Sequence, residues 1–169
     1  MENAPVIITA KLAKSDQSWA NGLRRAHFPP ERNFLDAHVT LFQHLPPRHM
    51  PEIKSRLANM ASQSVRPDAW LSGIMLMGRG VAYQIESPDL TSMREELAHA
   101  FQGLLIPQDQ AALRLHITVQ NKVEPPVAKA LYSKLCATFE PRMIGISGFS
   151  AYYYRGGPWE CIQSWNFRR

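Results

Sequence analysis

Two short segments of the sequence place a histidine and a threonine two positions apart, with aliphatic residues between and after them. One segment is HVTL at residues 38–41, and the other is HITV at residues 116–119. Because side chains alternate between the two faces of a β-strand, each histidine shares a face with its threonine. Each segment is therefore predicted to be a strand that is anchored from behind and presents a polar His–Thr pair.

Paired imidazoles suit in-line displacement at a phosphodiester. One imidazole, of His38 or His116, removes a proton from the attacking oxygen, and the other donates a proton to the leaving oxygen. The unperturbed histidine pKa of about 6.5 makes both protonation states accessible at neutral pH. The hydroxyls of Thr40 and Thr118 can donate hydrogen bonds to the non-bridging phosphate oxygens. We expect this chemistry to need no metal ion and no other cofactor.

A metal site is the competing interpretation of the histidines. A zinc site made by His38, His44 and His49 would need a local turn to bring them together, and no carboxylate or thiolate completes the set at a familiar spacing. The two cysteines, Cys136 and Cys161, are too few and too far apart for a zinc knuckle or a disulfide framework. The residues therefore favour acid–base catalysis over metal binding.

The two tetrapeptides resemble the signature motifs of the 2H phosphoesterase superfamily, which includes the RNA 2′,3′-cyclic phosphodiesterases, also called 2′-5′ RNA ligases. The resemblance implies a two-lobed fold whose motifs face each other across a cleft. It also implies that His116 is the general base and His38 the general acid, with Thr40 and Thr118 binding the phosphate. Better-known members often have an arginine shortly after the second motif, where this chain has Gln-Asn-Lys at residues 120–122.

The resemblance implies hydrolysis of a 2′,3′-cyclic phosphate at an RNA end or on a nucleotide. The reverse step would join a 5′-hydroxyl to the cyclic phosphate and form a 2′-5′ linkage. Two alternatives stay open: a non-catalytic nucleotide- or RNA-binding module on the same scaffold, and a hydrolase of a non-RNA cyclic phosphate such as an ADP-ribose derivative. Two intact histidines favour catalysis, because binding alone needs no acid–base pair.

Six further side chains are candidates for substrate binding, chosen by strand periodicity or by position at a turn: Phe42, Lys122, Tyr154, Trp159, Arg79 and Arg155. On an unbroken strand, Phe42 follows His38 on the same face and could stack on a base, and Lys122 could meet a phosphate. Aromatic residues of the closing strands could line a nucleotide cleft. For each of the six, an ordinary place in the core or at a solvated turn is the competing interpretation.

The elements that must position the motifs follow from apolar periodicity and from Pro and Gly. Strands are predicted at residues 6–12, 37–45, 70–77, 81–85, 113–119, 143–154 and 159–167, and helices at about 15–27, 51–61, 89–104 and 125–139. Strand–helix–strand–helix–strand thus occurs twice. We expect one α+β domain of two pseudo-symmetric lobes, formed by residues 1–78 and 79–169. Each lobe should have a small, mostly antiparallel sheet with helices on its outer face, and the active-site cleft should lie between the lobes.

Length and composition agree with one globular domain. The chain has 169 residues, of which 45% are hydrophobic and 20% charged, and a net charge of +5 that permits an anionic partner. No apolar stretch is long enough to span a bilayer, and the first residues lack the pattern of a secretory signal. We expect a cytoplasmic monomer that binds an RNA terminus or a nucleotide with a cyclic phosphate and does not associate with membranes.

Overall fold

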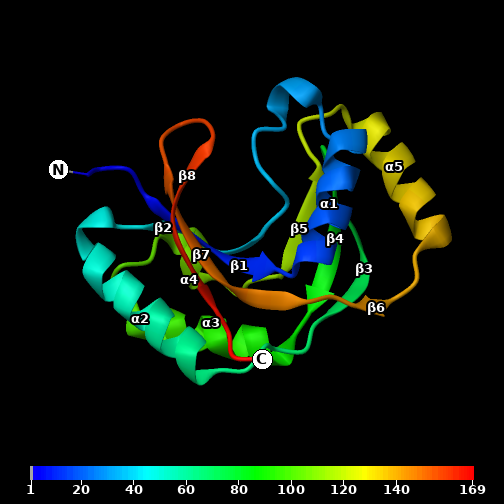
Figure 1. The fold of residues 1–169 in the computed structure, drawn as a ribbon. Helices are drawn as coiled ribbons and strands as arrows, with labels where there is room; N and C mark the ends of the chain where they lie inside the picture. The colour runs from blue at the N-terminus through cyan, green and yellow to red at the C-terminus, as the bar shows by residue number, and fades with distance from the viewer. Residues whose placement is uncertain (1) are drawn as a thin grey trace.

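The computed structural model describes residues 2–169 and has an α+β fold built on two antiparallel sheets (Figure 1). The strands are β1 (Val6–Leu12), β2 (Val39–Leu45), β3 (Trp70–Leu76), β4 (Val81–Glu86), β5 (His116–Gln120), β6 (Arg142–Met143), β7 (Ile146–Tyr154) and β8 (Trp159–Asn166). The helices are α1 (Lys14–His27), α2 (Met50–Gln63), α3 (Pro88–Ala100), the short α4 (Pro107–Gln110) and α5 (Pro125–Thr138).

The two sheets have the same layout but do not coincide with the two halves of the chain. The first sheet has the order β2-β1-β7-β8, and the second has the order β5-β4-β3-β6. The predicted lobes of residues 1–78 and 79–169 are therefore wrong, because β3 pairs with β4 while β7 pairs with β1. The pseudo-symmetry is confirmed: each motif strand, β2 or β5, pairs with the first strand of its own half.

The helices also cross between the sheets. Helix α1 directly follows β1 of the first sheet but packs against β5 of the second, where α5 covers β3 and β4. Helix α2 packs against β7 and β8, and α3 lies beside it (Figure 1). Proline at the first turn begins α3 and α5, where its missing N–H leaves no intrahelical bond unmade. None of these helices is long and apolar enough to cross a membrane, among the residues that the structure describes.

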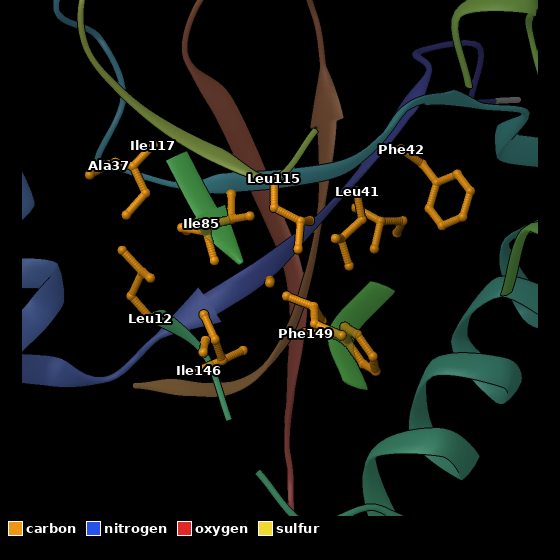
Figure 2. Close-up of a cluster of buried hydrophobic side chains, with 14 of the residues drawn as sticks. Leu12, Ala37, Leu41, Phe42, Ile85, Leu115, Ile117, Ile146 and Phe149 are labelled. Carbon is orange, nitrogen blue, oxygen red and sulfur yellow. The ribbon is translucent and has the colours of Figure 1, made fainter. Parts of the chain in front are cut away.

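One hydrophobic core joins the two sheets. Its side chains come from the inner faces of both sheets and from the helices, and Figure 2 shows Ile85 and Ile117 of the second sheet close to side chains of the first. Ala37 and Leu115, which precede the two motif histidines, are 3% and 4% exposed. The aliphatic residues of both motifs are buried as well, so both motifs are anchored from behind, as predicted.

Both motif strands contain a bulge at the fourth motif residue. In the first sheet Thr9 lies opposite Thr40 and the preceding residue lies opposite Phe42, so that Leu41 is an extra residue. In the second sheet Val119 is extra in the same way, between Thr118 and Gln120. A bulge interrupts the alternation of side chains along a strand. The side chain after each bulge, Phe42 or Gln120, is therefore buried instead of lying on the same face as the motif histidine.

Candidate active site

The two motif histidines are held by the same backbone tether. His38 immediately precedes β2, and its Nδ1 lies 2.8 Å from the carbonyl oxygen of Asp36. His116 begins β5, and its Nδ1 lies 2.7 Å from the carbonyl oxygen of Arg114. A carbonyl oxygen only accepts hydrogen bonds, so each Nδ1 carries the hydrogen. In both rings Nε2 is then the nitrogen that remains for proton transfer.

The surroundings of His38 disfavour its charged form. The pKa of His38 is lowered to about 4, mainly by burial and also by the positive charges of Arg24 and His116. The backbone tether to Asp36 and the charge of the Asp36 carboxylate act in the opposite direction. Strands β2 and β5 approach each other, and the charge of His116 acts on His38, so the two imidazoles are electrostatic neighbours. In the unliganded protein at neutral pH, His38 is therefore neutral.

The motif threonines occupy equivalent places in the two sheets. Thr40 pairs with Thr9 of β1, and Thr118 pairs with Ala82 of β4. Both threonines are half-buried, and the hydroxyl of Thr118 lies 4.0 Å from the sulfur of Met77. Neither hydroxyl is committed to a strong hydrogen bond within the described residues, so both are available as donors to a ligand.

A cleft of about 950 Å³ opens beside the first motif. It is lined by His38, by the loop that precedes it, and by side chains of β1, β7 and β8, among them Tyr152 and Trp159. Three basic residues also line it: Lys11, Lys14 and Arg66. His116, Thr40 and Thr118 lie outside this set of lining residues. The cleft therefore extends from His38 over the first sheet.

Trp159 is the aromatic candidate that the structure brings to His38. Its ring centroid lies 4.6 Å from that of His38 and 5.5 Å from that of Tyr152. Tyr154 pairs with Trp159 across the hairpin but lies outside the cleft lining, with 43% of its surface exposed. Of the two predicted aromatic ligands on the closing strands, Trp159 is thus the one beside the histidine.

Phe42 does not face the cleft. The bulge at Leu41 turns its ring into the core, where it is 0% exposed, edge-on to Phe101 and beneath the guanidinium of Arg94. The expectation that it stacks on a base assumed an unbroken strand and is corrected by this register. Lys122 is also off the strand, in a left-handed turn with φ 65° after β5, with its side chain exposed.

The two candidate arginines at turns are engaged by carboxylates. Arg79 donates to the carbonyl of Val123 and lies 3.5 Å from Glu124, which ties the β3–β4 turn to the loop after β5. Arg155 donates to both Glu2 and Glu160. Neither lines the cleft. Both therefore have structural partners in the unliganded protein.

Sequence reasoning missed a buried arginine that contacts the second motif. Arg24 of α1 is 3% exposed, and its Nη1 donates to the carbonyl of Thr118 at 2.9 Å. An arginine in a helix is ordinarily solvated, so its residue type gave no signal. Among residues 2–169, no group of three or more His, Cys, Asp or Glu side chains gathers in a metal-binding arrangement.

Comparisons with known proteins agree with this fold. A sequence model described as the 2′-5′ RNA ligase superfamily matches residues 12–157. Comparison with curated proteins gives no match. The structure of TT0787 of Thermus thermophilus has a TM-score of 0.69 at 16% identity, covering 97% of this chain and 98% of that one. E. coli LigT complexed with 3′-AMP has a TM-score of 0.64 at 16% identity, covering 99% and 100%. A structure described as a phosphoesterase has a TM-score of 0.58 at 19% identity, covering 99% and 100%.

Proposed function

The chain belongs to the 2′-5′ RNA ligase superfamily, and from this premise we propose that it is a metal-independent phosphodiesterase of 2′,3′-cyclic phosphates. His38 and His116 are its acid–base pair. The observation that carries the proposal is the matched tether of the two rings: each Nδ1 is bound to a carbonyl two residues upstream, and each Nε2 is left for proton transfer. Packing alone gives no reason for the same tether in both motifs.

In the proposed reaction, water attacks the phosphorus of the cyclic phosphate. One imidazole takes a proton from the water, one ring P–O bond breaks, and the other imidazole protonates the departing ribose oxygen. The products are a phosphomonoester and a free hydroxyl. If a 5′-hydroxyl attacks in place of water, the same site forms a phosphodiester with a 2′-5′ linkage. The hydroxyls of Thr40 and Thr118 hold the non-bridging oxygens.

The order of the two roles depends on the bound phosphate. The family resemblance gives His38 the role of acid, yet in the unliganded protein its pKa of about 4 keeps it neutral at neutral pH. A phosphodiester anion next to the ring favours the imidazolium and raises this pKa. His38 therefore acts as the acid only if it becomes protonated when the substrate binds. If it stays neutral, it serves as the base.

The cleft supports a nucleotide substrate, and an RNA end in particular. Trp159 and Tyr152 offer rings on which a base can stack beside His38. Lys11, Lys14 and Arg66 place positive charge along the same cleft, where a sugar–phosphate backbone would lie. LigT, which shares this fold, has been solved with 3′-AMP bound.

A panel of substrates with product analysis tests the function. The panel holds a 2′,3′-cyclic mononucleotide, an oligoribonucleotide ending in a 2′,3′-cyclic phosphate, and a cyclic phosphate of ADP-ribose, all assayed with EDTA. We expect turnover of the first two substrates, with the oligonucleotide preferred. Turnover of the ADP-ribose compound alone would show that the substrate is a non-RNA cyclic phosphate. Binding without turnover of any compound would leave a nucleotide-binding module and refute the proposed catalysis.

A further inference from the structure

Two buried arginines lie on α1 and α3, the helices that follow the first strand of each half of the chain. Arg24 lies on α1, which follows β1, and Arg94 lies on α3, which follows β4. They are 3% and 7% exposed, and each guanidinium lies over a phenylalanine ring, at 4.3 Å for Arg24 and 4.5 Å for Arg94. Arginine is almost never fully buried without partners, so both must be held by specific contacts.

Each arginine is bonded to the motif strand of the opposite half of the chain. Nη1 of Arg24 donates to the carbonyl of Thr118 at 2.9 Å, and Nε of Arg94 donates to the carbonyl of Leu41 at 3.1 Å. Both acceptors are backbone atoms within a motif, at its third residue in one case and its fourth in the other. The arginines therefore tie α1 to β5 and α3 to β2, the strands of the two motifs.

The two arginines differ in how their charge is balanced. Arg94 also donates to the carbonyl of Asp109, a buried residue whose carboxylate opposes its charge. The other hydrogen bond of Arg24, from Nε, goes to the neutral side chain of Asn33 at 3.1 Å. The carboxylate that acts on Arg24 is that of Asp36, an exposed residue. An exposed carboxylate is screened by solvent, so the positive charge of Arg24 is less compensated.

We propose that Arg24 is a positioning residue that fixes the second motif against α1, and that its less compensated charge helps to keep His38 neutral. Arg94 is its structural counterpart, which holds the first motif but has no electrostatic role at the site. The catalytic consequence of this inference depends on the proposed function, whereas the effect on His38 does not.

The electrostatics around His38 distinguish the two arginines. The positive charge of Arg24 lowers the pKa of His38, and Arg94 is not among the groups that act on it. The other charged group on the loop of His38 is Asp36, which raises this pKa, and β5 contributes His116, which lowers it. The remaining titratable or charged side chains that line the same cleft are Lys11, Lys14, Arg66, Tyr152 and Cys161.

The titration of His38, followed by NMR of ¹⁵N-labelled imidazoles, tests the inference without any assay of activity. Loss of a positive charge favours the imidazolium, so the titration midpoint of His38 should move to higher pH in Arg24→Gln. It should stay near the wild-type value in Arg24→Lys, which keeps the charge. In Arg94→Gln, the matched control, it should not move, although that variant should melt at a lower temperature because a buried hydrogen bond is lost.

A second variant covers the case in which Arg24→Gln does not fold. Asn33→Asp keeps the acceptor for Arg24 Nε and gives the guanidinium a carboxylate partner, so the His38 midpoint should again rise. Equal midpoints in wild type, Arg24→Gln and Asn33→Asp would overturn the inference, as would an equal shift in Arg24→Gln and Arg94→Gln. Because the titration is read in the absence of substrate, a protein without phosphodiesterase activity would refute the proposed function and leave this result standing.

Discussion

At the scale of single residues, each motif histidine is held by a group outside its own motif, and the protonation of His38 depends on other such groups. Histidine and threonine two places apart on a strand predict a shared face from alternation alone. The tether from Nδ1 to the carbonyl two residues upstream depends on the backbone path of the loop before each histidine. The burial of Arg24 depends on α1 packing against β5, a strand far along the chain. Local sequence patterns predict neither the tether nor the burial of Arg24.

The depressed pKa of His38 predicts a particular dependence of stability on pH. In the unfolded chain His38 titrates near its ordinary value, and in the folded protein it titrates at about 4. Between these two values the unfolded state binds the additional proton, so the folded state loses stability as the pH falls from about 6.5 to 4. His38→Gln removes this contribution. The stability of wild type relative to His38→Gln should therefore decline across that window.

Urea unfolding at a series of pH values measures this difference. His99→Gln, at an exposed position on α3, is the control. Its free energy of unfolding should change with pH as that of the wild type does. A constant difference between wild type and His38→Gln from pH 6.5 to pH 4 would contradict a depressed pKa for His38.

At the scale of elements, most strands and helices follow from the sequence within a few residues. The first strand has the predicted bounds, and proline marks the starts of α3 and α5. The bulges at Leu41 and Val119 were not predictable, because they come from the pairing of β2 with β1 and of β5 with β4. They explain why Phe42 lies in the core and why alternation fails beyond each motif.

Phe42 supplies a direct test of the bulge. Because its ring is fully buried against Phe101, Phe42→Ala should leave a cavity and lower the free energy of unfolding by about 3–5 kcal/mol. Affinity for a nucleotide should not change at temperatures where the variant is folded. Chemical denaturation and nucleotide titration measure the two effects. A variant of wild-type stability with weakened nucleotide binding would place Phe42 in the cleft instead.

At the scale of the whole molecule, the two halves of the chain exchange strands and helices, and this exchange brings the two motif strands near each other. Local pairing of neighbouring strands predicts two lobes divided near residue 78, yet each sheet takes strands from both sides of that point. The sequence pattern reveals the repeat but not which strands pair, because both arrangements bury the same apolar faces. The exchange packs both motif strands on the shared core and makes His116 an electrostatic neighbour of His38.

The cleft predicts a preference for longer substrates. Lys11→Glu combined with Arg66→Glu reverses two charges along the cleft. The double variant should bind an oligonucleotide more weakly, because contacts to its phosphates are lost. We expect kcat/KM for a cyclic-phosphate oligonucleotide to fall by at least about 10-fold at low salt, with little change for the cyclic mononucleotide. Lys129→Glu, on an exposed position of α5, is the matched control. Equal losses for both substrates would show that the cleft does not hold the RNA strand.

The central claim is that His38 and His116 together transfer the protons at a cyclic phosphate. The measurement that tests it most directly is turnover of an oligonucleotide 2′,3′-cyclic phosphate in EDTA by folded His38→Ala, His116→Ala and the double variant, with His99→Ala as control. Each single variant should lose on the order of 10²- to 10⁴-fold, and the double variant should lose less than the product of the two. Near wild-type turnover in both single variants would contradict the account.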